Sequence, residues 1–337
     1  MSADRIRWPD YLKGIAILFV VVAHVLRGLV NNNILALSPF ISYIDSWIYA
    51  FHMPAFFFAS GIFVSKSAAG KTILQFAENK FRVIMYPYLL WSTVQIVIMM
   101  VVSGSTTHSI QWIDILRITY KPVMQFWFFY ALFLMLIIFI VMYKLNVKPF
   151  ILLLFSIFLY AAPNFVPMGP WGMVYIVSGY MVYFACGAGF SKLLLSRLPG
   201  MPTKTLSLST LIMISVLSLL VYVNPEPGPV IKVLSALCGI GWLVALSEVM
   251  SRYKYLNVFR DYGVVSLNIY VAHTIAAAAS RIVFQRFFGI SDVMLHIIIG
   301  VFAGVYAPIL LTWISSKLKM PYLFTLPVRP DKYKSYL

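Results

Sequence analysis

The chain has 337 residues, of which 61% are hydrophobic and only 11% are charged. A typical soluble domain is about 45–50% apolar and about 25% charged, so this chain carries more apolar surface than a soluble fold of its length can bury. The composition excludes a water-soluble globular enzyme, a disordered tail protein and a nucleic-acid-binding module with a solvated surface. It predicts an all-α, polytopic integral membrane protein.

Ten stretches approach the roughly 20 mostly apolar residues that a helix needs to cross the hydrocarbon layer. In chain order they are 11–30, 41–64, 83–102, 124–143, 149–162, 173–190, 205–223, 230–250, 263–284 and 293–315. The fifth stretch is short, and the sixth is rich in glycine. The first lacks the cleavage site of a signal peptide, so we interpret it as a membrane helix. No internal repeat or linker divides the chain, which predicts one domain over residues 1–337.

The formal net charge of +16 would suggest nucleic acid as a partner if the protein were soluble. When alternate loops are assigned to opposite sides of the membrane, twenty of the 26 Lys and Arg residues fall on one side. The other side holds the remaining six: Arg27, Arg117, Lys121, Lys232, Arg281 and Arg286. Because positive charge resists translocation, the first side and both termini are predicted to be cytoplasmic. The excess charge then indicates orientation and gives no evidence for nucleic acid.

The first predicted helix carries ionisable side chains inside the membrane, where each is costly and is by default a functional hypothesis. Lys13 and His24 are eleven residues apart, so they lie within about 20° of one helix face and ~16 Å apart along the axis. Asp10 and Arg27 flank this pair. A polar stripe through a spanning helix cannot face lipid. The stripe therefore predicts a protein interior or a water-filled path.

Two further histidines are predicted near mid-membrane. His52 follows Asp45 by seven residues and lies two residues before Pro54, which should loosen the helix and free backbone groups to face a cavity. His273 lies near the middle of the ninth stretch. Each of these histidines can instead be a structural residue with satisfied hydrogen bonds. Imidazole suits proton transfer because its unperturbed pKa is about 6.5.

A metal site is the weaker interpretation of these histidines. Three imidazoles can hold zinc, but no carboxylate or cysteine stands at ligand spacing, and the three helices need not meet. Cys186 and Cys238 form neither a metal-binding pair nor a redox motif. We therefore expect no metal. His108 and His296 lie near the outer edge and carry no predicted role.

The loop after the second stretch contains Lys80 and Arg82 at a helix mouth on the predicted cytoplasmic side. Two interpretations stay open. These charges either serve membrane orientation alone or bind a phosphorylated ligand that enters from the cytosol.

Four segments resemble the integral membrane acyltransferase family 3, which includes O-antigen and exopolysaccharide O-acetyltransferases. The first runs from Trp8-Pro9-Asp10 through Lys13 to His24 and is similar to the family's opening motif, in which a basic residue precedes a histidine by eleven positions. The other segments are Phe51-His52-Met53-Pro54 through Gly61, Trp127-Phe128-Phe129-Tyr130-Ala131-Leu132, and Ser266 through Tyr270 to His273. Together they spread over most of the chain.

The chain also departs from the family pattern. Position 13 is Lys where many members have Arg, and Lys lacks the planar fork of a guanidinium. The third-helix mouth reads Asn79-Lys80-Phe81-Arg82 where members often have two arginines three residues apart. Long members carry an extra soluble esterase-like domain, and we expect none appended here.

The resemblance implies transfer of an acyl group, usually acetyl, from cytosolic acetyl-CoA or another acyl-CoA to a hydroxyl of a glycan or glycolipid across a bacterial inner membrane. On this hypothesis His24 is the base, and His52 or His273 orients it or stabilises the oxyanion. Lys13, Lys80 and Arg82 hold the CoA, and Asp10 orients Lys13. The alternative is a proton-coupled secondary transporter or glycolipid exporter, since midplane ionisable residues suit both classes. The oligomeric state, a homodimer included, stays open.

Overall fold

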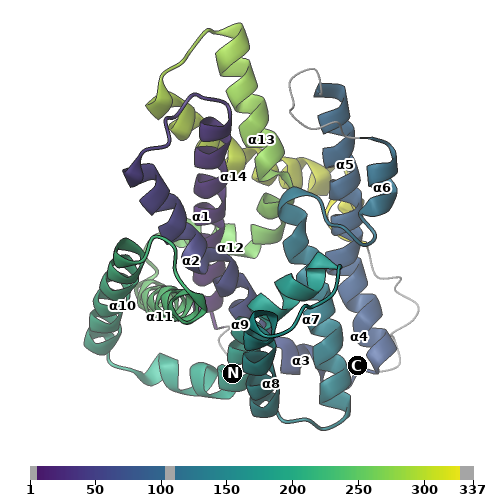
Figure 1. The fold of residues 1–337 in the computed structure, drawn as a ribbon, viewed down its shortest axis with the longest axis vertical. Coiled ribbons are helices and arrows are strands. Elements are labelled where there is room, and N and C mark those ends of the chain that lie inside the picture. The colour runs from purple at the N-terminus through teal and green to yellow at the C-terminus, as the bar shows by residue number, and fades with distance from the viewer. Residues whose placement is uncertain (1–5, 103–110, 327–337) are drawn as a thin grey trace.

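The computed structural model describes residues 6–102 and 111–326, and within these ranges the chain forms helices and no strand. The helices are drawn in Figure 1. They are α1 (Trp8–Asn31), α2 (Pro39–Ile62), α3 (Val64–Ala68), α4 (Ile73–Lys80), α5 (Tyr86–Val102), α6 (Ile113–Arg117), α7 (Trp127–Lys144), α8 (Pro149–Ala161), α9 (Gly172–Arg197), α10 (Thr203–Val223), α11 (Pro229–Tyr253), α12 (Asn257–Val264), α13 (Ser266–Phe287) and α14 (Val293–Lys317). His108 and four of the cations counted above, Arg5, Arg329, Lys332 and Lys334, lie outside the described residues.

The predicted all-α, polytopic membrane class is confirmed. Eight helices of the described chain are long and apolar enough to cross a membrane. The other two predicted spans also form helices. α2 has 24 residues but includes Asp45, His52 and Pro54, and α8 has 13 residues, which rise about 20 Å against a hydrocarbon layer of about 30 Å. Ten crossings and cytoplasmic termini therefore remain predictions.

Helix α1 packs against α2, α11, α12, α13 and α14 (Figure 1). Its closest neighbour is α12. A Cβ added at Gly14 would lie 1.6 Å from the Phe259 carbonyl oxygen, and one added at Gly263 would lie 1.7 Å from the Asp10 carbonyl oxygen. The two backbones therefore touch, and only glycine fits at this crossing. The Tyr11 hydroxyl also donates to Asn257 Oδ1 at 2.7 Å. α12 thus fixes the turn of α1 that carries Asp10 and Lys13.

Helix α2 is joined to α7 and α9 by aromatic side chains, which we call the aromatic cluster: Phe57, Trp127, Phe128 and Tyr180. The Phe57 ring centroid lies 4.8 Å from that of Phe128 and 5.1 Å from that of Tyr180. Trp127 lies 5.1 Å from Tyr180. Each such pair adds about 0.5–1.5 kcal/mol beyond the burial of its area. The cluster holds the middle of α2 at a fixed place relative to α7 and α9.

Candidate functional site

Two of the predicted site residues meet. The rings of His24 on α1 and His273 on α13 have centroids 5.0 Å apart with an interplanar angle of 61°. His273 Nδ1 lies 2.7 Å from the Tyr270 carbonyl oxygen, so Nδ1 carries the hydrogen and Nε2 is an acceptor. That Nε2 is buried and has no partner in the described part of the chain. His24 is the one described histidine that is not fully buried. In this pair, the His273 ring is held by its hydrogen bond to the backbone, and the His24 ring is partly exposed.

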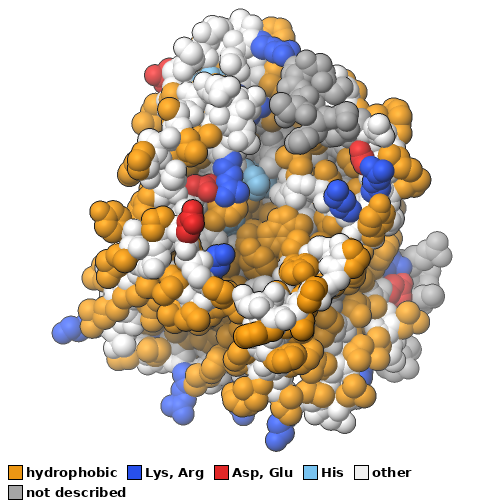
Figure 2. Space-filling model, viewed as in Figure 1, with side chains coloured by type: hydrophobic (Ala, Val, Ile, Leu, Met, Phe, Trp, Pro, Cys, Tyr) orange, Lys and Arg blue, Asp and Glu red, His pale blue; other side chains and the backbone are white. Residues whose placement is uncertain are grey.

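Figure 2 shows one face of the molecule, coloured by side-chain type. The face in view is hollowed at its centre, where a histidine side chain is visible beside basic and acidic side chains, and hydrophobic side chains line the floor.

His52 lies on α2 and is 1% exposed. Its Nδ1 is 2.6 Å from the Ile48 carbonyl oxygen, and its ring centroid is 4.7 Å from that of Tyr49. The guanidinium carbon of Arg27 lies 3.3 Å from the Tyr49 ring centroid. His52 is therefore linked to the helix of His24 through Tyr49 and Arg27, and it makes no ring contact with His24 or His273 among the described residues.

Arg27 and Asp45 form a two-pronged ion pair between α1 and α2. Arg27 Nε and Nη2 donate to the two carboxylate oxygens of Asp45, each at 2.7 Å. Parallel N–H bonds of this kind fix geometry as well as charge. The pair holds the C-terminal part of α1, which carries His24, against the N-terminal part of α2, which leads to His52.

A cavity of about 780 Å³ lies at the other end of α1. It is lined by Lys13, Lys66 and Lys80, and by one carboxylate, Asp10. Lys13 Nζ lies 2.9 Å from Asp10 Oδ1. We call this space the lysine cavity. The charge of its lining is net positive, and it lies on the predicted cytoplasmic side. Lys66 lines it as well, although no role was predicted for this residue.

Arg82 does not share the position of Lys80. It donates to Glu78 Oε1 at 2.8 Å, and it is not among the described residues that line the lysine cavity. The chain between α4 and α5 forms a π-helical segment, Phe81–Met85, and such wider turns are frequent at functional sites. Two positions so close in a helix point to opposite sides, which explains why Lys80 and Arg82 separate.

Residues 6–313 match the family model described as an acyltransferase domain. The chain belongs to the membrane acyltransferase family 3. Comparison with curated proteins and with solved structures gives no match. The resemblance noted in the sequence is thereby confirmed, and the protein is a multi-pass membrane acyltransferase that acts on an acyl donor and an acceptor.

In this family 3 acyltransferase, the buried side chain and backbone of Gln125 form hydrogen bonds beside the histidine pair. These contacts were not predicted from the sequence. Gln125 Nε2 donates to Thr274 Oγ1 at 2.8 Å, and Tyr270 donates to the Gln125 carbonyl oxygen. Gln125 is 3% exposed, and its side-chain oxygen has no partner in the described chain. Gln125 stands at the start of the predicted span 124–143, two residues before the segment that begins at Trp127, but a single amide at the end of a span gives no periodic signal.

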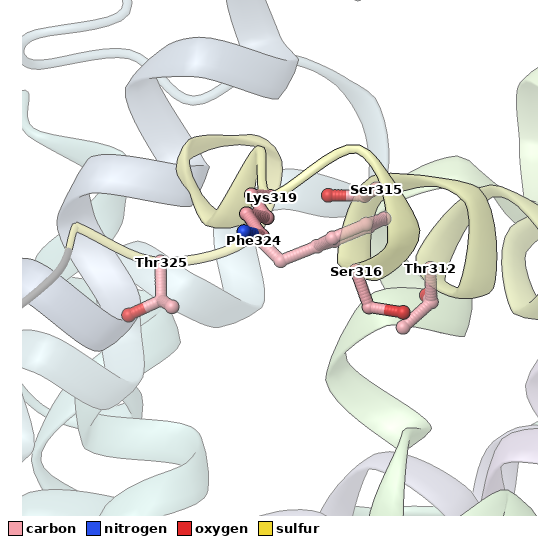
Figure 3. A pocket seen from close by; sticks show the side chains of 6 residues that line it. All are labelled: Thr312, Ser315, Ser316, Lys319, Phe324 and Thr325. Carbon is pink, nitrogen blue, oxygen red and sulfur yellow. The ribbon is translucent and has the colours of Figure 1, made fainter.

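Another cavity, of about 440 Å³, lies at the end of α14 (Figure 3). Its lining side chains are Thr312, Ser315, Ser316, Lys319, Phe324 and Thr325, and none of them is a predicted site residue. Among the described residues, no three His, Cys, Asp or Glu side chains come together as ligands for a metal ion.

Proposed function

We propose that this acyltransferase moves an acyl group, usually acetyl, from cytosolic acyl-CoA to a hydroxyl of a cell-envelope or exported glycan in a bacterial inner membrane. The observation that supports this most strongly is the arrangement along α1. Lys13 lines a lysine cavity at the predicted cytoplasmic end, and His24 meets His273 further along the same helix.

The lysine cavity suits the donor because CoA carries several phosphate charges. Ammonium groups bind phosphate as point charges, and a cleft lined by one sign of charge concentrates ligands of the opposite sign. Lys13, Lys66 and Lys80 supply that charge, and Asp10 at 2.9 Å holds Lys13 in place. With the nucleotide in this cavity, the pantetheine arm has to reach from the level of Lys13 to that of His24, ~16 Å away along α1.

His24 is the proposed general base. One of its ring nitrogens takes the proton of the acceptor hydroxyl, and the oxygen attacks the thioester carbonyl carbon. When the tetrahedral intermediate collapses, the C–S bond breaks and the CoA thiolate takes up the proton held by His24, so that the products are the ester and free CoA and His24 is neutral again. His24 suits this role because it is accessible and makes no hydrogen bond within the described chain.

His52 and His273 are better suited to orienting His24 than to stabilising an oxyanion. Both rings place Nδ1 against a backbone carbonyl oxygen, that of Ile48 for His52 and that of Tyr270 for His273. A neutral ring in this tautomer presents Nε2 as an acceptor, and an acceptor repels a developing negative charge. His273 is therefore the proposed positioning partner of His24, because the two rings are in contact and its Nε2 is an acceptor without a partner in the described chain.

The test uses the full-length protein in nanodiscs with radiolabelled acetyl-CoA and a panel of bacterial glycans. We expect acyl transfer and CoA release with wild type, and a loss of about 100-fold or more in His24→Ala, because general base catalysis contributes about 10²–10⁴-fold. His296→Ala is the matched control, since this buried histidine bonds the Ile290 carbonyl oxygen and contacts none of the site residues.

Two results would contradict the proposal. One is the absence of both transfer and CoA release with wild type. The other is full activity in His24→Ala. If wild type instead moved a glycolipid or protons across sealed vesicles without consuming acetyl-CoA, the transporter interpretation would replace it.

A further inference from the structure

A third cavity, of about 430 Å³, is lined by residues of α2, α8, α9, α10 and α11 and of the loop between α10 and α11. Four tyrosines line it: Tyr49, Tyr160, Tyr180 and Tyr183. We propose that this tyrosine cavity binds the acceptor by a sugar ring. The inference rests on the proposed function, because it assigns a place and a chemical class to the acceptor of that same reaction.

The hydroxyl groups in the cavity are open to a ligand. Tyr160 donates to the Pro229 carbonyl oxygen, but the hydroxyls of Tyr49, Tyr180 and Tyr183 make no hydrogen bond with the described residues. Tyr183 is only 4% exposed. A phenolic hydroxyl both donates and accepts; Tyr49 and Tyr180 are half-buried, and the Tyr183 hydroxyl is not one of the fully buried atoms without a partner, so these hydroxyls can pair with water or a ligand. Three such groups around one cavity match the hydroxyls of a sugar.

The tyrosine rings and the charge of the lining select among ligands. A sugar ring presents C–H bonds on its face, and the negative face of an aromatic ring attracts them. The lining contains one cation, Lys232, and no carboxylate among the described residues, so it differs sharply from the lysine cavity. A hydrocarbon chain would fit the rings but would leave the three hydroxyls unpaired, at a cost in binding.

The cavity also lies where an acceptor is needed. Its lining residues on α2 extend from Ser46, nearer the predicted outer side, to Pro54. This part of the helix is about 12 Å long. The lysine cavity begins on the same helix at Ala59, about 8 Å further on. His52 lies beside the inner end of the tyrosine cavity, 4.7 Å from the ring of Tyr49. On this proposal, donor and acceptor approach the histidines from opposite ends of α2.

The experiment measures binding of sugars without any acyl transfer. Full-length protein in nanodiscs is equilibrated with radiolabelled methyl glucoside, methyl galactoside and methyl rhamnoside in separate dialysis cells, and decanol serves as the hydrocarbon probe. Tyr183→Phe removes one hydroxyl and keeps the ring, and Tyr180→Ala removes a ring. The control is Tyr222→Phe, because Tyr222 is 73% exposed and is not part of the lining.

We expect wild type and Tyr222→Phe to bind at least one of the sugars equally. Tyr183→Phe should weaken that binding about fivefold, as for the loss of one neutral hydrogen bond, and Tyr180→Ala should weaken it by about tenfold or more. Acetyl-CoA affinity should stay unchanged in every variant, which also shows that the variants are folded.

The inference is overturned if wild type binds none of the three sugars, if Tyr183→Phe and Tyr180→Ala bind sugar as wild type does, or if decanol binds where sugar does not. Failure of the proposed function would be seen elsewhere, as a lack of His24-dependent CoA release, so the two failures are distinguishable.

Discussion

At the scale of single residues, two basic side chains that are close in sequence have different surroundings. Lys80 lines the lysine cavity, whereas Arg82 is paired with Glu78 on the preceding turn. A side chain that lines a cavity can contact a ligand there, and one whose charge is already paired contributes mainly to its own helix. The two interpretations of this loop, membrane orientation alone or binding of a phosphorylated ligand, therefore predict different effects for changes at Lys80 and Arg82.

We therefore expect Lys80→Ala to weaken acetyl-CoA binding about tenfold, since it removes one charge-assisted contact to phosphate. Arg82→Ala should leave the affinity within about twofold. Isothermal titration with acetyl-CoA on protein in nanodiscs measures both. Lys204→Ala, at an exposed position outside the cavity, controls for general loss of positive charge. If Lys80→Ala and wild type bound acetyl-CoA equally, Lys80 would serve membrane orientation alone.

At the scale of helices, the position of the site depends on how α12 lies against α1. The crossing leaves no room for a Cβ at position 14 or at position 263. Lys13 and Asp10 lie directly beside it. A short helix that makes no part of the lysine cavity thereby determines where the cavity's basic residues stand.

Gly14→Ala is expected to push α12 away from α1. It should lower the thermal unfolding midpoint by several degrees, because overpacking costs about 1–3 kcal/mol or more, and it should weaken acetyl-CoA binding by displacing Lys13. Gly172→Ala is the matched control, since an added Cβ there meets nothing within 4 Å. Thermal unfolding in detergent, followed by circular dichroism, and CoA titration provide the two measurements. A Gly14→Ala protein with the wild-type midpoint would mean that the crossing is looser than described.

The sequence predicts the helices well but not how they meet. Hydropathy placed every predicted span on a helix, and spacing alone put Lys13 and His24 on one face of α1. The contact of His24 with His273 joins residues about 250 positions apart, and no local pattern encodes it. Lys80 and Arg82 point to opposite sides even in a regular helix, but no local pattern shows which of them lines the lysine cavity, because that cavity forms only where residues of α1, α2, α3 and α7 come together with Lys80.

At the scale of the whole molecule, the proposal requires the two cavities to open to opposite sides of the membrane. The lysine cavity is on the side that holds most of the basic loops, and the tyrosine cavity lies beside Asn224, Pro225 and Pro227 in the loop after α10. Helix α10 (Thr203–Val223) is one of the eight long apolar helices, so its two ends report the two sides.

Single cysteines at the ends of α10 test this orientation. In a background of Cys186→Ala and Cys238→Ala, Lys204→Cys and Glu226→Cys place one thiol at each exposed end. A membrane-impermeant maleimide added to intact spheroplasts should label Glu226→Cys and leave Lys204→Cys unlabelled until the membrane is opened. The reverse pattern would invert the predicted topology and place the lysine cavity away from the cytosol.

The aromatic cluster has a consequence for the electrical properties of the membrane. Phe57 lies on α2 between Pro54, where one cavity ends, and Ala59, where the other begins, and its ring packs on Phe128 and Tyr180. Two hydrated recesses separated by about one helical turn would conduct ions if they joined, and the voltage across the membrane would collapse. On the proposed topology, the rings that fix α2 would therefore also keep the two recesses from joining into a path for ions.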